Sequence, residues 1–246
     1  MTSKTISISL TCALITVLSA CRPLYRASIP NQPMLTEKNE LEVDVGVETG
    51  SGYVNASYSL SNHILITAGG NAWSNNNTSA QFGEIGVVFF HYNASENFGG
   101  SVLAQTGFGN ANVIDNDLFD DPFNGNQTGL IEYNAQFTRF SLQPGIYWKM
   151  EHLDVGMGLR NSVVYWLAPS NYDSQTVDGY DIFAEPVVSM QAGSAATKFF
   201  LESSLQIPIY RAFRHPVTPF HLGLGISFLI SKKTLSSYPQ QKAVEQ

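Results

Sequence analysis

From Glu40 onward the chain alternates apolar and polar residues with a period of two. In Glu40 to Glu48, leucine and valine alternate with acidic residues and glycine. Successive side chains of a β-strand point to opposite faces, so this segment has one apolar face and one acidic face. The same pattern recurs in residues 54–60, 64–68, 83–89, 139–149, 153–160, 182–190, 199–205 and 220–228. The sequence therefore predicts an all-β protein.

We count about ten such segments, and the connections between them alternate in length. Short turns are expected at 61–62, 93–96, 151–152 and 193–196, and longer segments at 74–79, 110–137, 168–179 and 210–219. Short turns on one rim and long loops on the other are typical of outer-membrane barrels. We therefore predict an up-and-down antiparallel β-barrel of about ten strands, of the membrane type. An even number of strands returns the C-terminus to the rim at which the barrel begins.

A soluble barrel of the lipocalin type also shows alternation, but it turns its apolar face inward, around an apolar ligand. That alternative stays open, and it requires Leu41, Val43, Phe140 and Leu142 to face the interior. The membrane barrel is favoured because the polar face is rich in glycine and carries few lysines. Aromatic residues also lie near predicted strand ends, as in interfacial girdles. These residues are Trp73, Tyr92, Trp148, Tyr165, Trp166 and Tyr180.

The N-terminus has the pattern of a bacterial lipoprotein signal. Lys4 precedes a largely apolar run from Ile6 to Val17, and Leu18-Ser19-Ala20-Cys21 follows it. Small residues before a cysteine form a lipobox, whose cysteine thiol is acylated and becomes the mature N-terminus. We therefore predict a signal peptide over residues 1–20 and a diacylglycerol anchor on Cys21. Beyond the signal, no apolar stretch approaches the roughly 20 residues of a spanning helix, so any insertion must use β-strands.

The remaining boundaries follow from composition. Residues 21–38 contain three prolines and lack periodicity, so they are predicted to be a lipidated, extended tether. Residues 39–231 form the β-barrel domain, a length that suits one unit. Residues 232–246 are predicted to be a polar C-terminal tail in the periplasm.

Composition excludes several classes of function. The two cysteines are Cys12, inside the signal, and Cys21, so the mature chain has no thiol for a disulfide, a thiolate metal site or a nucleophile. The formal net charge is −7, and loss of Lys4 makes it more negative, which argues against nucleic acid as a partner. The acidic run Asp115 to Asp121 lacks the spacing of an EF-hand loop. No metal and no cofactor is predicted; the expected partners are outer-membrane lipid and envelope proteins that bind the loops.

Charged residues of both signs fall on the predicted polar face and are expected to line the lumen. They are Glu42, Asp44, Glu84, Arg139, Lys149, Asp154, Arg160, Glu185 and Glu202. In a narrow barrel these charges must pair or stay hydrated, because an unpaired buried charge costs several kcal/mol. One interpretation is a salt-bridged interior that fixes the shape of the barrel. The other is a small polar pore whose selectivity these residues set.

An enzyme would need a nucleophile and a base. The histidines are scattered singly, at His63, His91, His152, His215 and His221. His221 falls on the predicted inner face, but no serine in a recognisable motif accompanies it. We expect turn or interface roles for all five and predict no catalytic residue. A lipid hydrolase or acyltransferase is the third alternative, with His221 as its most plausible base.

Two segments carry a resemblance to a known group of proteins. The tether and first strand, Pro30-Asn31-Gln32-Pro33-Met34-Leu35-Thr36-Glu37-Lys38-Asn39-Glu40, and Leu142-Gln143-Pro144-Gly145 with the strand after it, are similar to lipoproteins of Bacteroidota-type bacteria that are predicted to form outer-membrane β-barrels. The resemblance implies an envelope location and the barrel fold, and it supplies no catalytic or ligand residues. Arg22-Pro23-Leu24-Tyr25 departs from the acidic run that sends such lipoproteins to the cell surface. The anchor is therefore expected on the periplasmic side of the outer membrane.

Overall fold

The computed structural model of the chain describes residues 34–48, 51–75, 78–116, 130–168, 179–194, 196–212 and 219–231. The predicted signal peptide, Cys21, the tail 232–246 and most of the run Asp115 to Asp121 lie outside these residues. In the described part, no helix is long and apolar enough to cross a membrane. The strands are β1 (Leu41–Glu48), β2 (Ser51–Ser59), β3 (Ile64–Asn75), β4 (Thr78–Asn93), β5 (Phe98–Asn116), β6 (Leu130–Lys149), β7 (Leu153–Ala168), β8 (Gly179–Gly193), β9 (Thr197–Leu205), β10 (Ile207–Arg211) and β11 (Phe220–Ile230).

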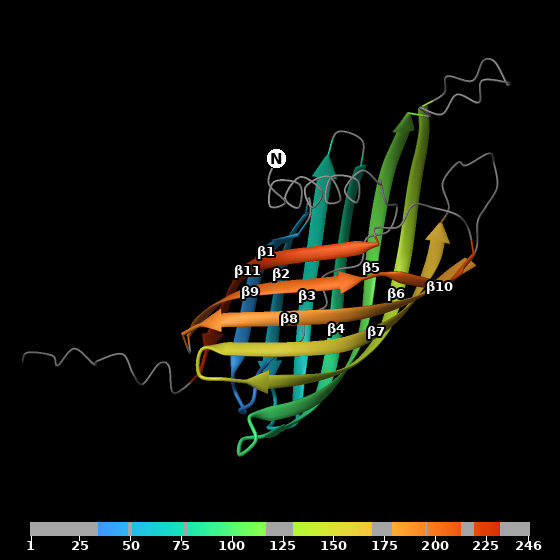
Figure 1. Cartoon of the computed structure of the whole chain (residues 1–246). Coiled ribbons are helices and arrows are strands. Elements are labelled where there is room, and N and C mark those ends of the chain that lie inside the picture. Colours follow the sequence, from blue (N-terminus) through green and yellow to red (C-terminus); the bar gives the residue numbers. More distant parts are fainter. Residues whose placement is uncertain are drawn as a thin grey trace, which may run out of the picture.

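These strands form one closed antiparallel sheet (Figure 1). Each strand from β1 to β8 pairs with the next, β1 also pairs with β11, and β11 pairs with β9, which pairs with β8. β9 and β10 occupy one position in the barrel, because β9 pairs with Val187–Gly193 of β8 and β10 pairs with Asp181–Ala184. Gln206 interrupts them, and its backbone N–H donates to the carbonyl of Pro219 at 2.7 Å. The predicted up-and-down barrel of about ten strands is confirmed.

The register fixes how steeply the strands tilt. Followed once around the barrel, the row of paired residues that starts at Tyr147 returns to β6 at Ala135, which is a shear of 12 residues. Shear and strand number together set the tilt of a closed barrel. A shear slightly larger than the number of strands accompanies the tilt of about 35–45° that is usual in membrane barrels.

The two rims differ in their connections. At one rim β1 begins, β11 ends, and four short turns join β2 to β3, β4 to β5, β6 to β7 and β8 to β9; we call it the short-turn rim. The opposite end is the loop rim. Two predicted loops there are shorter than expected, because β3 and β4 pair as far as Asn75 and Thr78, and the β5–β6 ladder reaches Asn116 and Leu130. A ladder is held by backbone hydrogen bonds, so Asn-rich and Gly-rich segments can continue it without an apolar face.

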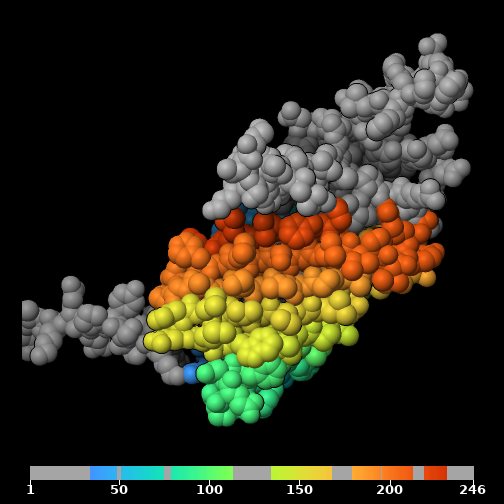
Figure 2. Space-filling view, viewed as in Figure 1, coloured from blue at the N-terminus to red at the C-terminus, as the bar shows by residue number. Residues whose placement is uncertain are grey.

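Apolar side chains cover the outside of the barrel. Phe199 is 67% exposed and Leu142 is 51% exposed, whereas the neighbouring inward residues are buried. Figure 2 shows the outer surface of β7, β8, β9 and β11 as one continuous wall. The soluble-barrel alternative required Leu41, Val43, Phe140 and Leu142 to face inward, and all four lie on the outer face, so that alternative is wrong. An apolar exterior around a polar interior is the arrangement of a membrane barrel.

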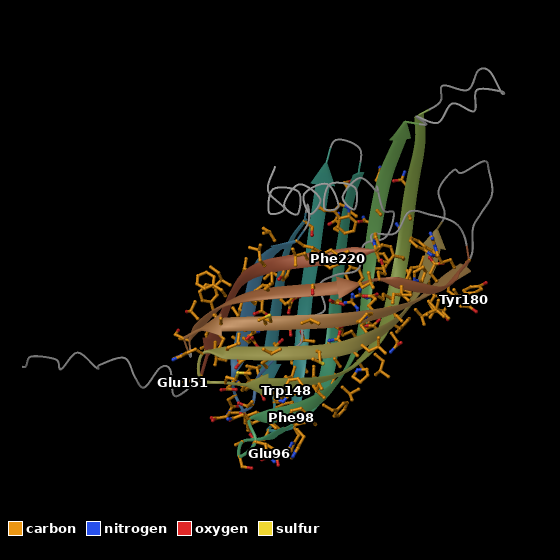
Figure 3. The ribbon with its side chains drawn as sticks, in the orientation of Figure 1. Glu96, Phe98, Trp148, Glu151, Tyr180 and Phe220 are labelled. Atoms are coloured by element: carbon orange, nitrogen blue, oxygen red, sulfur yellow. The ribbon has the colours of Figure 1, made fainter. Side chains whose placement is uncertain are left out.

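Aromatic side chains lie on the outer surface near both rims (Figure 3). The rings of Phe98 and Trp148 are 5.2 Å apart near the short-turn rim. Those of Tyr180 and Tyr210 are 5.2 Å apart near the loop rim. Such belts occupy the membrane–water interface. Three residues predicted for these belts do not belong to them. Trp73 and Trp166 are buried in the lumen, and Tyr92, which shares the inward parity of Phe90, stacks on the buried ring of Tyr147. In β7 the outward residue is Tyr165, and the next position must face inward.

Candidate functional site

The structure places the nine charged residues predicted for the lumen on the inner face of six strands. Lys149 is half-buried, and the other eight are less than a tenth exposed. They are Glu42 and Asp44 of β1, Glu84 of β4, Arg139 and Lys149 of β6, Asp154 and Arg160 of β7, Glu185 of β8, and Glu202 of β9. The lumen is therefore a buried, highly charged space with an apolar exterior around it.

Two arginines form buried ion pairs with glutamates. The guanidinium of Arg160 donates through Nε to Glu185 at 2.7 Å, and a second nitrogen donates to the same oxygen. Arg139 binds Glu84 across β5, where Gly107 lies between them in the register. Because Gly107 has no side chain, it leaves room for the ring of Phe82, over which the Arg139 guanidinium lies. Charge-assisted hydrogen bonds of this kind are among the stronger ones in proteins.

Near the short-turn rim, two of the polar contacts link strands that are not neighbours. Lys198 of β9 binds Asp154 of β7, across β8. Glu42 accepts hydrogen bonds from Gln191 at 3.1 Å and from Ser227 at 3.0 Å, so one β1 carboxylate contacts both β8 and β11. Sequence reasoning missed Lys198, although its position between outward residues of β9 would have predicted it.

The end of the predicted tether is folded into the short-turn mouth. Met34 and Leu35 are 3% and 2% exposed. The carbonyl of Met34 accepts a hydrogen bond from Lys149 Nζ at 2.8 Å. The carboxylate of Glu40 accepts the backbone N–H groups of residues 36 and 37 at 3.1 and 2.9 Å, which holds the turn before β1. Leu35 packs in one buried cluster with Leu65, Val88, Phe90 and Leu103. Segment 34–35 thus occupies this mouth of the lumen, a contact that the period-two pattern could not predict.

At the loop rim, aromatic side chains from β3, β4, β6, β7 and β8 pack against one another inside the barrel. We call this cluster the aromatic wall: Trp73, Phe82, Phe137, Trp166 and Phe183. Phe82 and Phe137 stack with ring centres 5.7 Å apart, and Phe137 meets Trp166 edge-on at 5.6 Å. The Arg139 guanidinium lies 4.4 Å from the centre of the Phe82 ring, which adds a cation–π contact. The aromatic wall is a packed surface, and the Arg139–Glu84 ion pair lies beneath it.

The facing side of the loop rim is polar. We call its members the polar rim group: Glu48 of β1, His221 of β11, and Ser204 and Gln206 at the end of β9. His221 Nδ1 lies 2.5 Å from Glu48 Oε1, and Ser51 donates to the other Glu48 oxygen at 3.3 Å. His221 was expected in a turn or an interface, and the structure places it in the lumen at 2% exposure. A stricter use of the β1 alternation would have found Glu48, which shares the parity of Glu42.

The lumen has an excess of negative charge. Among the described residues, nine acidic side chains are buried, against two arginines. In that part of the chain no group of three or more His, Cys, Asp or Glu side chains is arranged to hold a metal ion. An acid-rich lining favours cations over anions in a narrow passage.

Similar solved structures include three barrels. The N-terminal β-barrel domain of OprF from Pseudomonas aeruginosa has 11% identity and a TM-score of 0.34, with 78% of this chain and 98% of that chain covered. The translocator domain of the autotransporter NalP from Neisseria meningitidis has 11% identity and a TM-score of 0.42, with 77% and 86% covered. The KdgM porin has 9% identity and a TM-score of 0.35, with 77% and 98% covered.

No protein-family model matches the chain, and no curated protein matches it. At these identities and TM-scores, the roles of the three similar proteins do not transfer to this chain. The function proposed below therefore rests on the residues of the barrel itself.

Proposed function

We propose that this protein is a lipid-anchored outer-membrane β-barrel with a structural role, whose loops are available to bind envelope proteins. The observation that carries the proposal is the inverted distribution of side chains. Apolar residues such as Phe199 and Leu142 are exposed on the outside, and Arg160 and Glu185 are wholly buried inside. In water, such an exterior would promote aggregation, whereas in a bilayer it contacts lipid tails that are equally apolar.

The position of the N-terminal segment supports an anchor on the periplasmic side. Met34 lies in the short-turn mouth, and the stretch back to Cys21 reaches at most about 45 Å when fully extended. A diacylglycerol on Cys21 could therefore enter the leaflet beside that rim. Barrels of this type place short turns in the periplasm and long loops outside the cell. The loop rim would then face the exterior.

Packing within the lumen supports a structural role over an open channel. Phe137, Tyr147, Arg160 and Glu185 are all fully buried, so protein atoms surround them on every side. Leu35 also occupies the short-turn mouth. A filled, salt-bridged interior holds the cross-section of a small barrel in one shape.

The first test is heat-modifiability of the mature protein, extracted in detergent and run unboiled and boiled on a gel. A membrane barrel resists detergent when unboiled, so the unboiled band should migrate differently from the boiled one. Leu142→Cys and Gln143→Cys variants in native membranes complete the test. Leu142→Cys should react only with a lipid-soluble thiol reagent, because it faces the bilayer. Rapid reaction of Leu142→Cys with a charged reagent, without a mobility shift, would refute the membrane barrel.

The anchor has a separate test. Cys21→Ser should abolish incorporation of labelled palmitate and keep the heat-dependent mobility shift, because the barrel lies downstream of the tether. Unchanged palmitate incorporation in Cys21→Ser would disprove lipidation at this residue and leave the barrel proposal intact.

A narrow cation pore is the second candidate, and one observation favours it. Leu35, which closes the short-turn mouth, belongs to the N-terminal segment and is held there by packing of its side chain, next to the contact between Met34 and Lys149. Leu35→Asp should expel that segment and give cation-selective conductance in planar bilayers, while the wild type stays closed. Leu60→Asp is the control, because Leu60 lies in an exposed turn at the same rim. Equal currents from the two variants would rule out a mouth closed by Leu35.

A further inference from the structure

The polar rim group contains buried polar atoms that pair with nothing in the described protein. They are His221 Nε2, Ser204 Oγ and both atoms of the Gln206 side-chain amide. Each of these side chains is 3% exposed or less. Buried polar groups are nearly always hydrogen-bonded, so several unpaired groups on adjoining positions need an explanation. Unpaired buried atoms also occur elsewhere in the lumen, as at Asn71 and Gln143. The polar rim group differs from these because a carboxylate, an imidazole and a serine adjoin one another there.

The register arranges three of these side chains in the order of a charge-stabilised nucleophile. β11 lies between β1 and β9, and its His221 is directly opposite Ser204 of β9. Directly opposite residues of an antiparallel pair have Cβ atoms about 4.5–5.5 Å apart. On the other side of β11, Glu48 holds His221 Nδ1 at 2.5 Å. The carboxylate occupies one imidazole nitrogen, and the other nitrogen is left for a group on the serine side.

We propose that Ser204, His221 and Glu48 form an acyl-transfer site at the loop rim, which cleaves the carboxylic ester of a membrane lipid. Ser204 is the nucleophile, His221 is the general base, and Glu48 orients the imidazole and stabilises its protonated form. The Gln206 amide, two residues from Ser204 on the same face of the chain, supplies an N–H donor for the oxyanion. This activity goes beyond the structural role proposed above.

The hydrolysis needs water as its only co-reactant. Ser204 Oγ attacks the carbonyl carbon and gives its proton to His221 Nε2, while the carbonyl electron pair moves to oxygen beside Gln206. Collapse of this tetrahedral intermediate breaks the ester C–O bond, and His221 returns the proton to the leaving alkoxide. Water, deprotonated by His221, then attacks the acyl-serine, releases the fatty acid and restores the hydroxyl group.

The location of the site selects the substrate class. β1 ends at Glu48 and β11 begins at Phe220, so the site lies beside the loop-rim ends of these two strands, while β10 continues past it at the barrel position of β9. Leu205 and Phe220 are exposed on the outer face beside it, and Figure 3 shows Phe220 at this end of β11. An acyl chain lying on that apolar surface would bring its ester linkage, which sits at the membrane interface, to the rim.

Ser204 Oγ and His221 Nε2 are not hydrogen-bonded to each other in this structure. A turn of the serine side chain about its Cα–Cβ bond changes the distance between them without moving the strands. Catalytic hydrogen bonds are often long before substrate binds and shorten in the reacting complex. The register places the two residues opposite each other, and the contact between their side chains is part of the proposal.

The test uses the full-length mature lipoprotein in phospholipid vesicles with a fluorophosphonate probe, which forms a phosphonate ester with an activated serine and releases fluoride. Mass spectrometry should locate the adduct on Ser204, and Ser204→Ala should abolish it. His221→Gln and Glu48→Gln should each lower the labelling rate, by about 10²–10⁴ for loss of the base. Release of free fatty acid from phosphatidylethanolamine in the same vesicles should fall in parallel.

Ser189→Ala is the matched control. Ser189 is a buried serine on the inner face whose hydroxyl also lacks a partner, but it lies opposite Glu202 instead of a histidine. It should label like the wild type. A heat-dependent mobility shift in every variant establishes that each one folds, and it keeps this test separate from that of the barrel. Absence of any Ser204 adduct on the folded wild type, or equal loss of labelling in Ser189→Ala, would overturn the proposal.

Discussion

The two sides of the loop rim differ in how their inward side chains pack and form hydrogen bonds. On one side the aromatic wall packs large rings together, and Trp166 Nε1 donates to Asp181 at 3.1 Å, although the buried amide of Asn71, opposite Phe82, has no partner within the described protein. On the other side the polar rim group leaves an imidazole nitrogen, a hydroxyl and an amide without partners in the described protein. Packing and hydrogen bonding therefore stabilise one side, whereas the other keeps reactive atoms at a cost in stability.

Strand length separates these two sides. β4 to β8 have 15 to 20 residues, and four of them carry members of the aromatic wall. β1, β2 and β11 have 8 to 11 residues, and their loop-rim ends lie at the polar rim group. β9 has 9 residues, but β10 continues its position in the barrel. The strands that carry the aromatic wall thus extend further at the loop rim than β1, β2 and β11 do beside the polar rim group. A substrate in the membrane interface would meet the side of the polar rim group first.

The largest expected effect is on the aromatic wall. Phe137→Ala should lower the free energy of unfolding by about 3–5 kcal/mol, because it removes a fully buried ring that contacts Phe82 and Trp166. Urea titration of the protein in lipid vesicles, followed by tryptophan emission, measures it. A loss below about 1 kcal/mol would mean that the rings do not pack as one unit.

A substitution of the polar rim group should act in the opposite direction. Gln206→Leu should raise the free energy of unfolding by about 1–2 kcal/mol, because it replaces a buried, unpaired amide with an apolar group of similar size. The same titration checks it. A destabilised variant would show that the amide has a partner in solution, and the contrast between the two sides would then be weaker.

The Glu48–His221 contact should have a smaller effect on stability. Glu48→Gln keeps an acceptor for His221 Nδ1 but replaces a charge-assisted hydrogen bond with a neutral one. We expect a loss of about 1 kcal/mol. Comparison with His221→Gln, made in the same vesicles, separates loss of the bond from loss of the carboxylate charge. A loss above 3 kcal/mol would mean that Glu48 is chiefly a structural residue.

The smallest expected effect belongs to the proposed nucleophile. Ser204→Ala should change the free energy of unfolding by less than about 0.5 kcal/mol, because its hydroxyl forms no hydrogen bond within the described protein. Circular dichroism and urea titration measure this value beside the labelling rate. A large loss of stability in this variant would contradict an unpaired hydroxyl, and with it the contrast between the two sides.

The period-two pattern predicted the fold because it records directly which face of each strand meets lipid. It placed Phe140 and Leu142 outside and Glu185 inside, as the structure does. The expected aromatic belt was wrong for Trp73, Tyr92 and Trp166, since aromatic residues near strand ends suit an interface as well as a packed lumen. For these three residues the parity of the neighbouring positions was the better guide.

The polar rim group could not be predicted in the same way. Ser204 and His221 lie opposite each other only because of the register between β9 and β11. The connection between these two strands does not allow that register to be predicted from the sequence. Alternation gives a side chain its face and says nothing of the residue opposite it. The burial of Leu35 in the short-turn mouth was even harder to predict, because its segment has no periodicity.

The seam between β1 and β11 joins the first strand of the barrel to the last one. Until Phe220 to Ile230 has been synthesised and paired, the sheet has two unpaired edges, which are templates for aggregation. Assembly of the barrel therefore requires its last strand, because a chain that lacks β11 cannot close the sheet. A protein truncated before Phe220 should remain a substrate for envelope proteases, and biogenesis of this barrel should be all-or-none.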